Sequence, residues 1–299
     1  MDYAKEIKRL KKEKNAVVLA HNYQLPEVQD AADFTGDSLE LSRKAAATGA
    51  EIIVFAGVDF MAETAKILSP RKKVLITSRE AVCPMAAMLK PKDIENAKML
   101  HPEAEVVLYV NSSAECKSMA DCCCTSANAI EVVNAMESET VLFGPDRNLA
   151  DYVQRHSRKK VVAVPAEGYC YVHGCIEKEG LLAMKELHPE AVIISHPECV
   201  PEVIDISDYV GSTSQMLRIA KESGKKEFII ATEKEMVYRL GKENPDKKFY
   251  PVQAICGQMK KTGIESVYNS LKNGEFEVEI PAEITEKAVK AINRMLEIK

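Results

Sequence analysis

Short apolar runs of four or five residues alternate along the chain with longer segments in which apolar residues recur every three or four positions. The short runs are typical of buried β-strands, and the longer segments are typical of amphipathic helices. Strands that alternate with helices in this way predict βαβ units and parallel sheets. The pattern therefore indicates an α/β protein.

The whole pattern of strands and helices occurs three times along the chain. The pentapeptide Leu-His-Pro-Glu-Ala stands at residues 100–104 and again at 187–191, each time where a predicted helix leads into an apolar strand. Three aspartates, Asp33, Asp121 and Asp208, follow the first strand of each unit, and a cysteine comes 50, 49 and 48 residues after them. The predicted strands are 16–20, 51–55 and 72–76; 105–109, 139–143 and 159–163; and 191–195, 227–231 and 247–250.

A period of this length marks a repeated structural unit. We predict three homologous α/β/α sandwich domains, each with a small parallel sheet and right-handed crossovers, around a pseudo-threefold axis. The predicted boundaries are 1–88, 89–175 and 176–261. The remaining segment, 262–299, is expected to form a helix over 263–273, a strand over 276–280 and a helix over 282–298 that pack back on an earlier unit.

Functional residues of parallel α/β sheets gather at the carboxyl ends of the strands, so three such units could share one central cavity. Hydroxyl residues at the three helix starts predict N-caps, and helix N-termini also suit substrate carboxylates or a phosphate. Among the strand-end residues, Tyr23 and Glu198 are candidates for proton transfer. The equivalent sets are His21, Tyr109 and His196; Tyr23, Asn111 and Glu198; and Ser38, Ser126 and Thr213.

The chain has nine cysteines and no C-x2-C pair, which favours a metal or a reactive thiol over a disulfide framework. Only Cys83, Cys170 and Cys256 match across the repeat. Three thiolates on one axis suit either a catalytic zinc or an iron–sulfur cluster with one iron not bound by protein. Thiolate-only coordination favours the cluster, whose open iron could hold a substrate oxygen and assist loss of water.

The other cysteines and histidines are less informative. Cys122 and Cys123 are expected to pack in a short strand, whereas Cys124 lies beside the predicted cavity and is open between packing and a minor site role. His173, three residues after Cys170, is equally open between a role beside the cluster and a purely local one. The histidines of the repeated pentapeptide are interpreted as structural.

Charge and hydropathy exclude two classes of partner. The net charge of −5 is spread along the chain, without the basic stripe that binding to nucleic acid or an anionic membrane requires. No run of about 18 apolar residues is found, so no membrane span is predicted. The first ten residues form a charged amphipathic pattern without a signal-peptide core, and a cytoplasmic protein is expected.

Eight short motifs, taken together and in this order, resemble the quinolinate synthase family over essentially the full chain. They are AHNYQ at 20–24, GDSL at 36–39, VDFMAE at 58–63, YVNS at 109–112, TSAN at 125–128, FGPD at 143–146, HPEC at 196–199 and GST at 211–213.

The resemblance implies a condensing transferase of de novo NAD biosynthesis that joins iminoaspartate to dihydroxyacetone phosphate and releases phosphate and two waters. It implies one [4Fe–4S] cluster per chain on Cys83, Cys170 and Cys256, catalytic roles for Tyr23, Glu198 and His21, and a functional link to an enzyme that supplies iminoaspartate. By the same resemblance the residues that bind substrate are His21, Ser38, Tyr109, Asn111, Ser126, His196, Glu198 and Thr213, and Met259 lines the site.

Two residues depart from the family pattern: Tyr169 stands where a histidine is expected, and Ser214 where a glycine is expected.

Two rival functions also remain. The first is another three-cysteine [4Fe–4S] hydro-lyase acting on a small polycarboxylate. The second is an iron–sulfur carrier or a protein that binds small anions, which would not need Tyr23 and Glu198.

Overall fold

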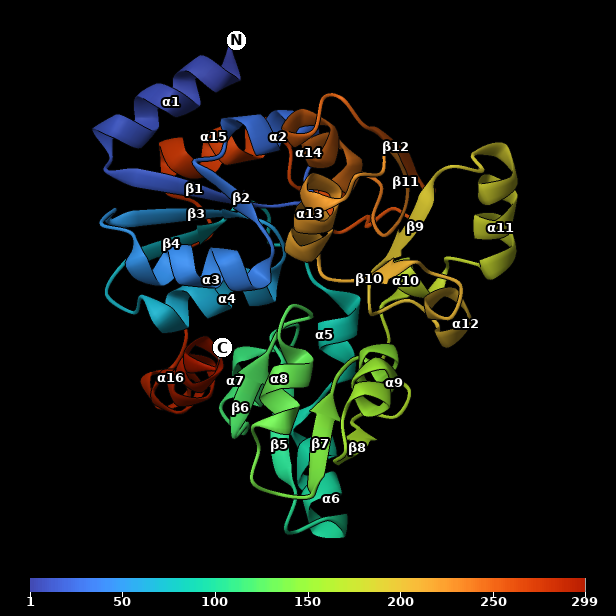
Figure 1. Cartoon of the computed structure of the whole chain (residues 1–299). Helices are drawn as coiled ribbons and strands as arrows, with labels where there is room; N and C mark the ends of the chain where they lie inside the picture. Colours follow the sequence, from blue (N-terminus) through green and yellow to red (C-terminus); the bar gives the residue numbers. More distant parts are fainter. Residues whose placement is uncertain (299) are drawn as a thin grey trace.

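The computed structural model describes residues 1–298 and contains three four-stranded sheets, one in each third of the chain. All neighbouring strands are parallel, and the strand order is the same each time: β2-β1-β3-β4, β6-β5-β7-β8 and β10-β9-β11-β12. Figure 1 shows the three units in blue, green and yellow-orange around a common centre. The predicted α/β fold with three small parallel sheets is confirmed. Lys299, which ends the predicted extension, lies outside the described residues.

The strands are β1 (Ala16–His21), β2 (Phe34–Gly36), β3 (Ile52–Ala56), β4 (Lys73–Ile76), β5 (Glu105–Tyr109), β6 (Cys122–Cys124), β7 (Thr140–Gly144), β8 (Lys160–Ala163), β9 (Val192–Ser195), β10 (Tyr209–Val210), β11 (Glu227–Ala231) and β12 (Lys248–Pro251). The helices of the first unit are α1 (Tyr3–Glu13), α2 (Pro26–Ala31), α3 (Ser38–Ala47), α4 (Asp59–Leu68) and α5 (Pro84–Met88). Those of the second are α6 (Pro91–Leu100), α7 (Ala114–Lys117), α8 (Ala129–Asn134), α9 (Arg147–His156) and α10 (Tyr171–Gly174). Those of the third are α11 (Lys178–Leu187), α12 (Pro201–Ile204), α13 (Thr213–Glu222), α14 (Met236–Glu243) and the 3-10 helix η1 (Met259–Lys261), followed by α15 (Ile264–Asn273) and α16 (Ala282–Glu297).

Alternate residues of each first strand enter different cores. In β1, Val17 and Leu19 belong to a large core that runs through all three units, whereas Val18 and Ala20 belong to a separate core under α1, α2 and α15. The outer faces of the second and third sheets have their own cores in the same way. Both faces of each sheet are therefore covered by helices, as a parallel sheet requires.

The repeated aspartates fasten the short edge strand of each sheet. Asp33 accepts a hydrogen bond from the backbone N–H of Val18 at 2.8 Å, and its own N–H donates to the Val18 carbonyl at 2.9 Å. Asp121 and Asp208 make the same pair of bonds with the residue fifteen positions earlier. The aspartate positions the chain for the second strand, and this explains why it recurs in register.

The segment after the third unit returns to the earlier ones. Helix α15 packs against α1, and α16 packs between α4 of the first unit and α7 and β6 of the second (Figure 1). The predicted strand over 276–280 is wrong: this segment makes a single antiparallel bridge, between Glu277 and Leu75. Phe276 has a φ of 60°, a left-handed conformation that interrupts extended backbone.

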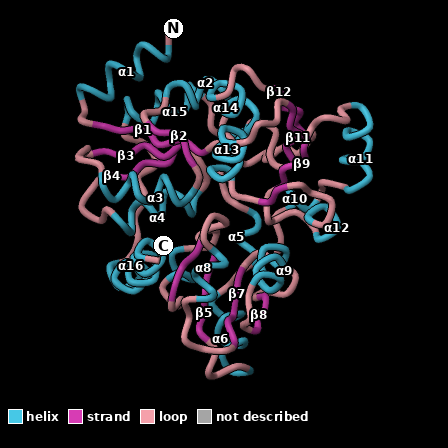
Figure 2. Tube along the Cα trace, in the orientation of Figure 1, coloured by secondary structure: helices cyan, strands magenta, loops and turns pink. Residues whose placement is uncertain are grey.

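Figure 2 separates strands from loops and shows the three groups of strands facing one central region. Within residues 1–298, no helix combines the length and the apolar character needed to cross a membrane.

Candidate active site

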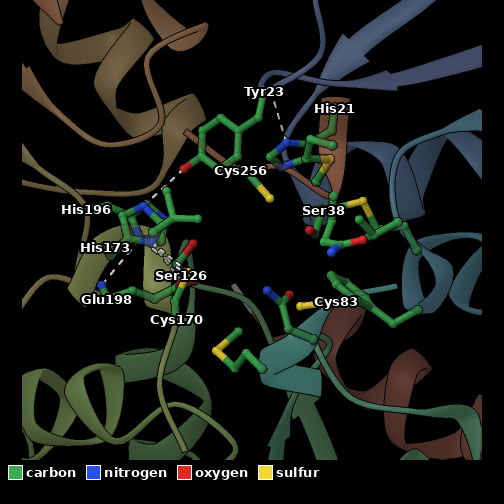
Figure 3. A pocket seen from close by; sticks show the side chains of 18 of the residues that line it. His21, Tyr23, Ser38, Cys83, Ser126, Cys170, His173, His196, Glu198 and Cys256 are labelled. Atoms are coloured by element: carbon green, nitrogen blue, oxygen red, sulfur yellow. Dashed lines mark hydrogen bonds and ion pairs between the residues drawn. The ribbon is translucent and has the colours of Figure 1, made fainter. Parts of the chain in front are cut away.

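Loops from all three units line one cavity of about 70 Å³. Several of these loops follow the first and third strands of a sheet, between which the strand order reverses, and ligands of open α/β sheets bind at this point. Figure 3 shows side chains from the three units turned toward the same space. The cavity wall contains every residue predicted for the site: His21, Tyr23, Ser38, Cys83, Tyr109, Asn111, Ser126, Cys170, His196, Glu198, Thr213 and Cys256. Met259 is part of it as well.

Each of the three cysteines is held by an acidic side chain of its own unit. The acid follows the third strand of the sheet and accepts a hydrogen bond from the backbone N–H of the cysteine. We call the loops that carry Cys83, Cys170 and Cys256 the cysteine loops. The pairs are Asp59 with Cys83 at 3.0 Å, Asp146 with Cys170 at 2.8 Å, and Glu233 with Cys256 at 3.3 Å. The backbone that carries each thiol is thus fixed in the same way three times.

The donor set of the cysteine loops fits an iron–sulfur cluster with three protein ligands. Burial raises the pKa of Cys83 to about 12, and burial also raises the pKa of Cys170 and Cys256. The thiols are therefore neutral in the protein alone, and a cationic group is needed to hold them as thiolates. Among the described residues that line the cavity there is no fourth cysteine, so a cluster held here would have three cysteine ligands.

Cys170, His173 and Glu198 also bring three potential metal ligands within 4.8 Å of one another. However, these groups already bond to each other: Nδ1 of His173 lies 2.9 Å from Oε2 of Glu198 and 3.3 Å from Sγ of Cys170. A single ion on this trio would have to displace those bonds. We therefore assign His173 and Glu198 to a hydrogen-bonded chain rather than to a metal site.

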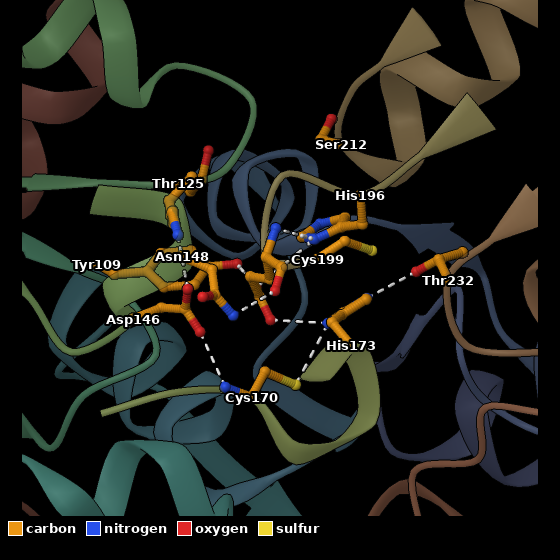
Figure 4. A network of polar contacts seen from close by, with 12 residues as sticks. Tyr109, Thr125, Asp146, Asn148, Cys170, His173, His196, Cys199, Ser212 and Thr232 are labelled. Atoms are coloured by element: carbon orange, nitrogen blue, oxygen red, sulfur yellow. Dashed lines mark hydrogen bonds and ion pairs between the residues drawn. The ribbon is translucent and has the colours of Figure 1, made fainter. Parts of the chain in front are cut away.

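This chain, which we call the polar chain, joins five buried side chains from the three units (Figures 3 and 4). The Tyr23 hydroxyl lies 2.6 Å from Oγ1 of Thr232, which lies 2.8 Å from Nε2 of His173. Nδ1 of His173 meets Glu198, and the other oxygen of Glu198 accepts a hydrogen bond of 2.5 Å from the Tyr109 hydroxyl. A connected series of this kind can pass a proton by small shifts of hydrogen between neighbours.

The acidic groups of the polar chain differ in whether their pKa values lie above or below the usual range. Burial raises the pKa of Tyr23 and of Tyr109 well above the usual range, so both phenols are protonated at neutral pH. Burial would also raise the pKa of Glu198, but electrostatic interaction with the His173 and His196 rings and hydrogen bonds from His173 and Tyr109 hold it below its usual value. The polar chain thus places an ionised carboxylate between two neutral phenols.

His21 and His196 occupy equivalent positions and make equivalent contacts. Nδ1 of each ring accepts the backbone N–H of the residue two positions later, Tyr23 at 3.2 Å and Glu198 at 3.3 Å. Burial lowers the pKa of His21 to about 4 and that of His196 to about 3, so both rings are neutral at pH 7. With Nδ1 used as an acceptor, the proton sits on Nε2, and each ring keeps one N–H donor.

The prediction that Ser38, Ser126 and Thr213 cap three helices is wrong, although a neighbouring hydroxyl residue does cap α13. Asp37 and Ser212 are the N-caps of α3 and α13, and Ser38 and Thr213 are the first residues inside those helices. In the second unit the helix begins only after Asn128, whose side chain accepts from Thr125 at 2.8 Å and closes a turn around Ser126. Of the three predicted helix starts, those of α3 and α13 therefore lie at the cavity.

One carboxylate joins these two helix starts. Oδ2 of Asp37 accepts a hydrogen bond from the Ser212 hydroxyl at 3.2 Å and another from the Ser214 hydroxyl. Ser214, which departs from the family pattern, thus adds a donor to this contact between the first and third units. The other departure, Tyr169, lies against Arg147, with 5.1 Å from the guanidinium to the ring centroid.

Sequence reasoning missed two groups of residues. Thr232, which bridges Tyr23 and His173, stands where the other units have Val58 and Pro145; a lone hydroxyl at an otherwise apolar repeat position was the available signal. The acids of the cysteine loops recur 24, 24 and 23 residues before the cysteines, which was a detectable pattern. Of the remaining cysteines, those of β6 are fully buried and Cys175 is exposed.

Comparisons with known proteins agree over the full length of the chain. The family described as quinolinate synthetase A protein (NadA) matches residues 5–297. The chain is 55% identical over 300 residues to the quinolinate synthase of Pyrococcus horikoshii, covering 100% of this chain and 99% of that protein. It is 55% identical over 296 residues to the quinolinate synthase of Pyrococcus furiosus, and 49% identical over 296 residues to that of Alkaliphilus metalliredigens, covering in each case 98% of this chain and 97% of the other.

Proposed function

Since the chain belongs to the quinolinate synthase family and is therefore an enzyme, we propose that it condenses iminoaspartate with dihydroxyacetone phosphate to give quinolinate, phosphate and two waters. The reaction makes it a transferase of de novo NAD biosynthesis, which needs another enzyme to supply iminoaspartate. The observation that carries the proposal is that three cysteine loops and the polar chain share one cavity.

The cofactor of the proposal is a [4Fe–4S] cluster on Cys83, Cys170 and Cys256. When bound, the cluster supplies a Lewis-acid iron that polarises a substrate oxygen and helps it to leave. The protein side of this site is the repeated acid contact, which fixes the backbone of each cysteine before any metal arrives. Three preset loops reduce the conformational entropy that ligand binding would otherwise cost.

Substrate carboxylates and the phosphate would lie against neutral donors. The N-termini of α3 and α13 carry partial positive charge, and Ser38 and Thr213 are their first residues. The Nε2–H groups of His21 and His196 add two donors without adding charge. Asn111 offers an acceptor, because its buried Oδ1 has no partner among residues 1–298. Tyr109 and Ser126 complete the wall on the side of the second unit.

Proton transfer would use the polar chain. Tyr23 is the group of the chain that can face the reacting carbon or oxygen, and its hydroxyl can exchange a proton with Thr232 and so with His173. Glu198 stabilises the imidazolium that forms when His173 takes up that proton, because the two lie 2.9 Å apart. Isomerisation and the two dehydrations each need such a shuttle, and general acid–base catalysis by one positioned group contributes about 10²- to 10⁴-fold.

The proposal is tested with protein purified and reconstituted without oxygen. Iminoaspartate and dihydroxyacetone phosphate are added together, and quinolinate is quantified by chromatography and mass spectrometry. We expect quinolinate and phosphate in equal amounts. Absence of quinolinate from protein with about four irons would overturn the proposal and favour another three-cysteine hydro-lyase, to be sought with other small polycarboxylates. The matched control is Glu198→Gln, which keeps the shape of the side chain and removes its charge.

An iron–sulfur carrier or an anion-binding protein predicts a different outcome of the same experiment. Such a protein would transfer its cluster to an apo-acceptor and would show no turnover. It would also have no use for a buried Tyr23 connected to a carboxylate through two further residues. Cluster transfer without quinolinate formation would therefore favour this rival.

A further inference from the structure

Asn22 lies between two residues of the proposed active site, His21 and Tyr23, but its side chain turns away from them. The amide is fully buried and connects two side chains of the third unit. Its Oδ1 accepts a hydrogen bond from Nη1 of Arg239 at 2.7 Å, and its Nδ2 donates to Oγ1 of Thr213 at 2.7 Å. The three residues form a short series from α14 to the first residue of α13.

The donor and acceptor of each hydrogen bond in this series follow from the chemistry of Arg239. A guanidinium donates hydrogen bonds and cannot accept one, so the amide atom that faces Arg239 must be the oxygen. The NH₂ group of Asn22 must then face Thr213. Because an amide NH₂ only donates, Oγ1 of Thr213 is compelled to act as the acceptor of that bond. The hydroxyl hydrogen of Thr213 therefore has to point elsewhere.

Within residues 1–298, Thr213 has no second side-chain partner for that hydrogen. Some hydroxyls inside the helices of this chain donate to the carbonyl four residues earlier, as Thr64 does to Phe60 at 2.7 Å and Ser42 to Ser38 at 2.6 Å. Thr213 is the first residue of its helix, so no preceding turn offers such a carbonyl. It is 2% exposed and lines the cavity, which is the space left for its hydrogen.

The guanidinium itself is well anchored. Nη1 of Arg239 also donates to the carbonyl of Thr35 at 2.7 Å, and Nε pairs with Glu243 at 2.7 Å. Thr35 precedes the helix start of the first unit, so the same arginine touches the backbone next to one anion-binding helix and orients a hydroxyl at the other. This placement keeps Asn22 from turning its amide over.

We propose that Asn22 and Arg239 are positioning residues that hold Thr213 as a hydrogen-bond donor toward a carboxylate or phosphate oxygen of the substrate. This inference rests on the proposed function, since it assumes an anionic ligand at the start of α13. Asn22 and Arg239 touch no substrate atom. They determine that the Thr213 hydroxyl points its hydrogen toward the anion. Without them this hydroxyl could turn a lone pair toward the anion.

The test is the affinity of anaerobic, cluster-loaded protein for quinolinate, measured by isothermal titration, together with kcat and KM. In Asn22→Asp the carboxylate cannot donate, so the Thr213 hydroxyl turns to it and presents lone pairs to the ligand. A hydrogen bond to a charged group is worth enough to predict a Kd about 10- to 100-fold higher. We expect KM to rise by a similar factor, with a smaller change in kcat, because the polar chain is intact.

A double-mutant cycle with Thr213→Val separates orientation from a general effect of the new charge. If Asn22 acts through Thr213, Asn22→Asp changes the Kd less than about twofold in the Thr213→Val background. An equal loss in both backgrounds, or wild-type affinity of Asn22→Asp alone, would overturn the inference while the proposed function stands. A wild-type protein that makes no quinolinate would remove both.

Arg239 gives a second variant in case Asn22→Asp does not fold, because this side chain reaches the surface. Arg239→Gln can donate or accept and so releases the amide of Asn22, whereas Arg239→Lys still only donates. We expect Arg239→Gln to raise the Kd for quinolinate about tenfold and Arg239→Lys to stay within about threefold of wild type. Identical affinities of the two variants would count against a role for Arg239.

Discussion

The cysteine loops and the strand-end loops, residues 21–23, 109–111 and 196–198, surround the same cavity but have kept the threefold repeat to different degrees. Each cysteine loop has the same thiol and the same acid-to-backbone contact in all three units. The strand-end loops carry His, Tyr and His at one position and Tyr, Asn and Glu at the other. One side of the cavity is nearly symmetric, and the other is not.

The difference follows from what each side has to do. Three metal ligands, as proposed for the cysteines, would perform the same task, so identical residues in identical surroundings would serve it. Proton transfer needs a donor and an acceptor whose pKa values differ, and three equal residues cannot provide both. The environment adds to this difference, because burial raises the pKa of Tyr23, while interactions with the neighbouring histidines and hydrogen bonds from His173 and Tyr109 hold that of Glu198 low. Substitutions on either side of the cavity test whether the two regions act independently.

The largest effect is expected in the cysteine loops. Cys170→Ser should abolish the visible absorption of the reconstituted cluster and lower the bound iron to a small fraction of four per chain, because a serine hydroxyl is a harder ligand than the soft thiolate that iron–sulfur clusters select. Electronic spectra and iron analysis under anaerobic conditions measure both. Cys123→Ala, in β6, and Cys175→Ser, on the surface, are matched controls that should keep the cluster. A normal spectrum of Cys170→Ser would remove Cys170 from the ligand set.

A large effect on turnover alone is expected in the strand-end loops. Tyr23→Phe removes one hydroxyl from the polar chain and leaves the cysteine loops unchanged, so kcat should fall about 10²- to 10⁴-fold with an unaltered cluster spectrum. Quinolinate formation and the electronic spectrum of the same sample measure the two sides separately. If Tyr23→Phe also lost the cluster, the two regions would not be independent.

The smallest effect is on stability and concerns only the strand-end loops. The pKa of His21 is about 4 in the folded chain and about 6.5 when unfolded, so between these pH values the unfolded chain binds a proton that the folded chain does not. The free energy of unfolding should therefore decrease as the pH falls from 6.5 to 4, by about 3 kcal/mol for this residue. The cysteine thiols do not titrate in this range, because burial raises their pKa.

Denaturant unfolding of cluster-free, reduced protein at several pH values tests this contribution. His21→Gln should flatten the pH profile by about 3 kcal/mol over the window, relative to the wild type measured under the same conditions. A His21→Gln profile parallel to that of the wild type would show that this histidine is not kept neutral by burial.

Much of the fold could be predicted because local signals recur in register. The aspartates at 33, 121 and 208 and the shared pentapeptide defined the period, and the apolar runs between them defined the strands. What failed depended on backbone conformation that composition does not reveal. The φ of 60° at Phe276 interrupts an otherwise strand-like run, and Asn128 closes a turn that delays α8.

The site could be predicted where the three units have functional side chains at equivalent positions. This equivalence identified twelve residues that line one cavity. The partners were not predicted where contacts cross between units. Thr232 enters the polar chain because the third unit lies against Tyr23 of the first, and Asn22 finds Thr213 at a separation of 191 residues. Such contacts follow from the packing of whole units, which no local pattern encodes.

Helix α16 has a consequence for the order in which the molecule is built. It packs against α4 and β6, and the Asn128 amide donates to the carbonyl of Met295 within it. During synthesis by the ribosome α16 is made after all three sheets, which can fold one after another as they emerge. The junction between the first two units is therefore completed only once residues beyond 282 have been translated. Insertion of the proposed cluster, which would need all three cysteines, would accordingly follow translation of the sheets rather than accompany it.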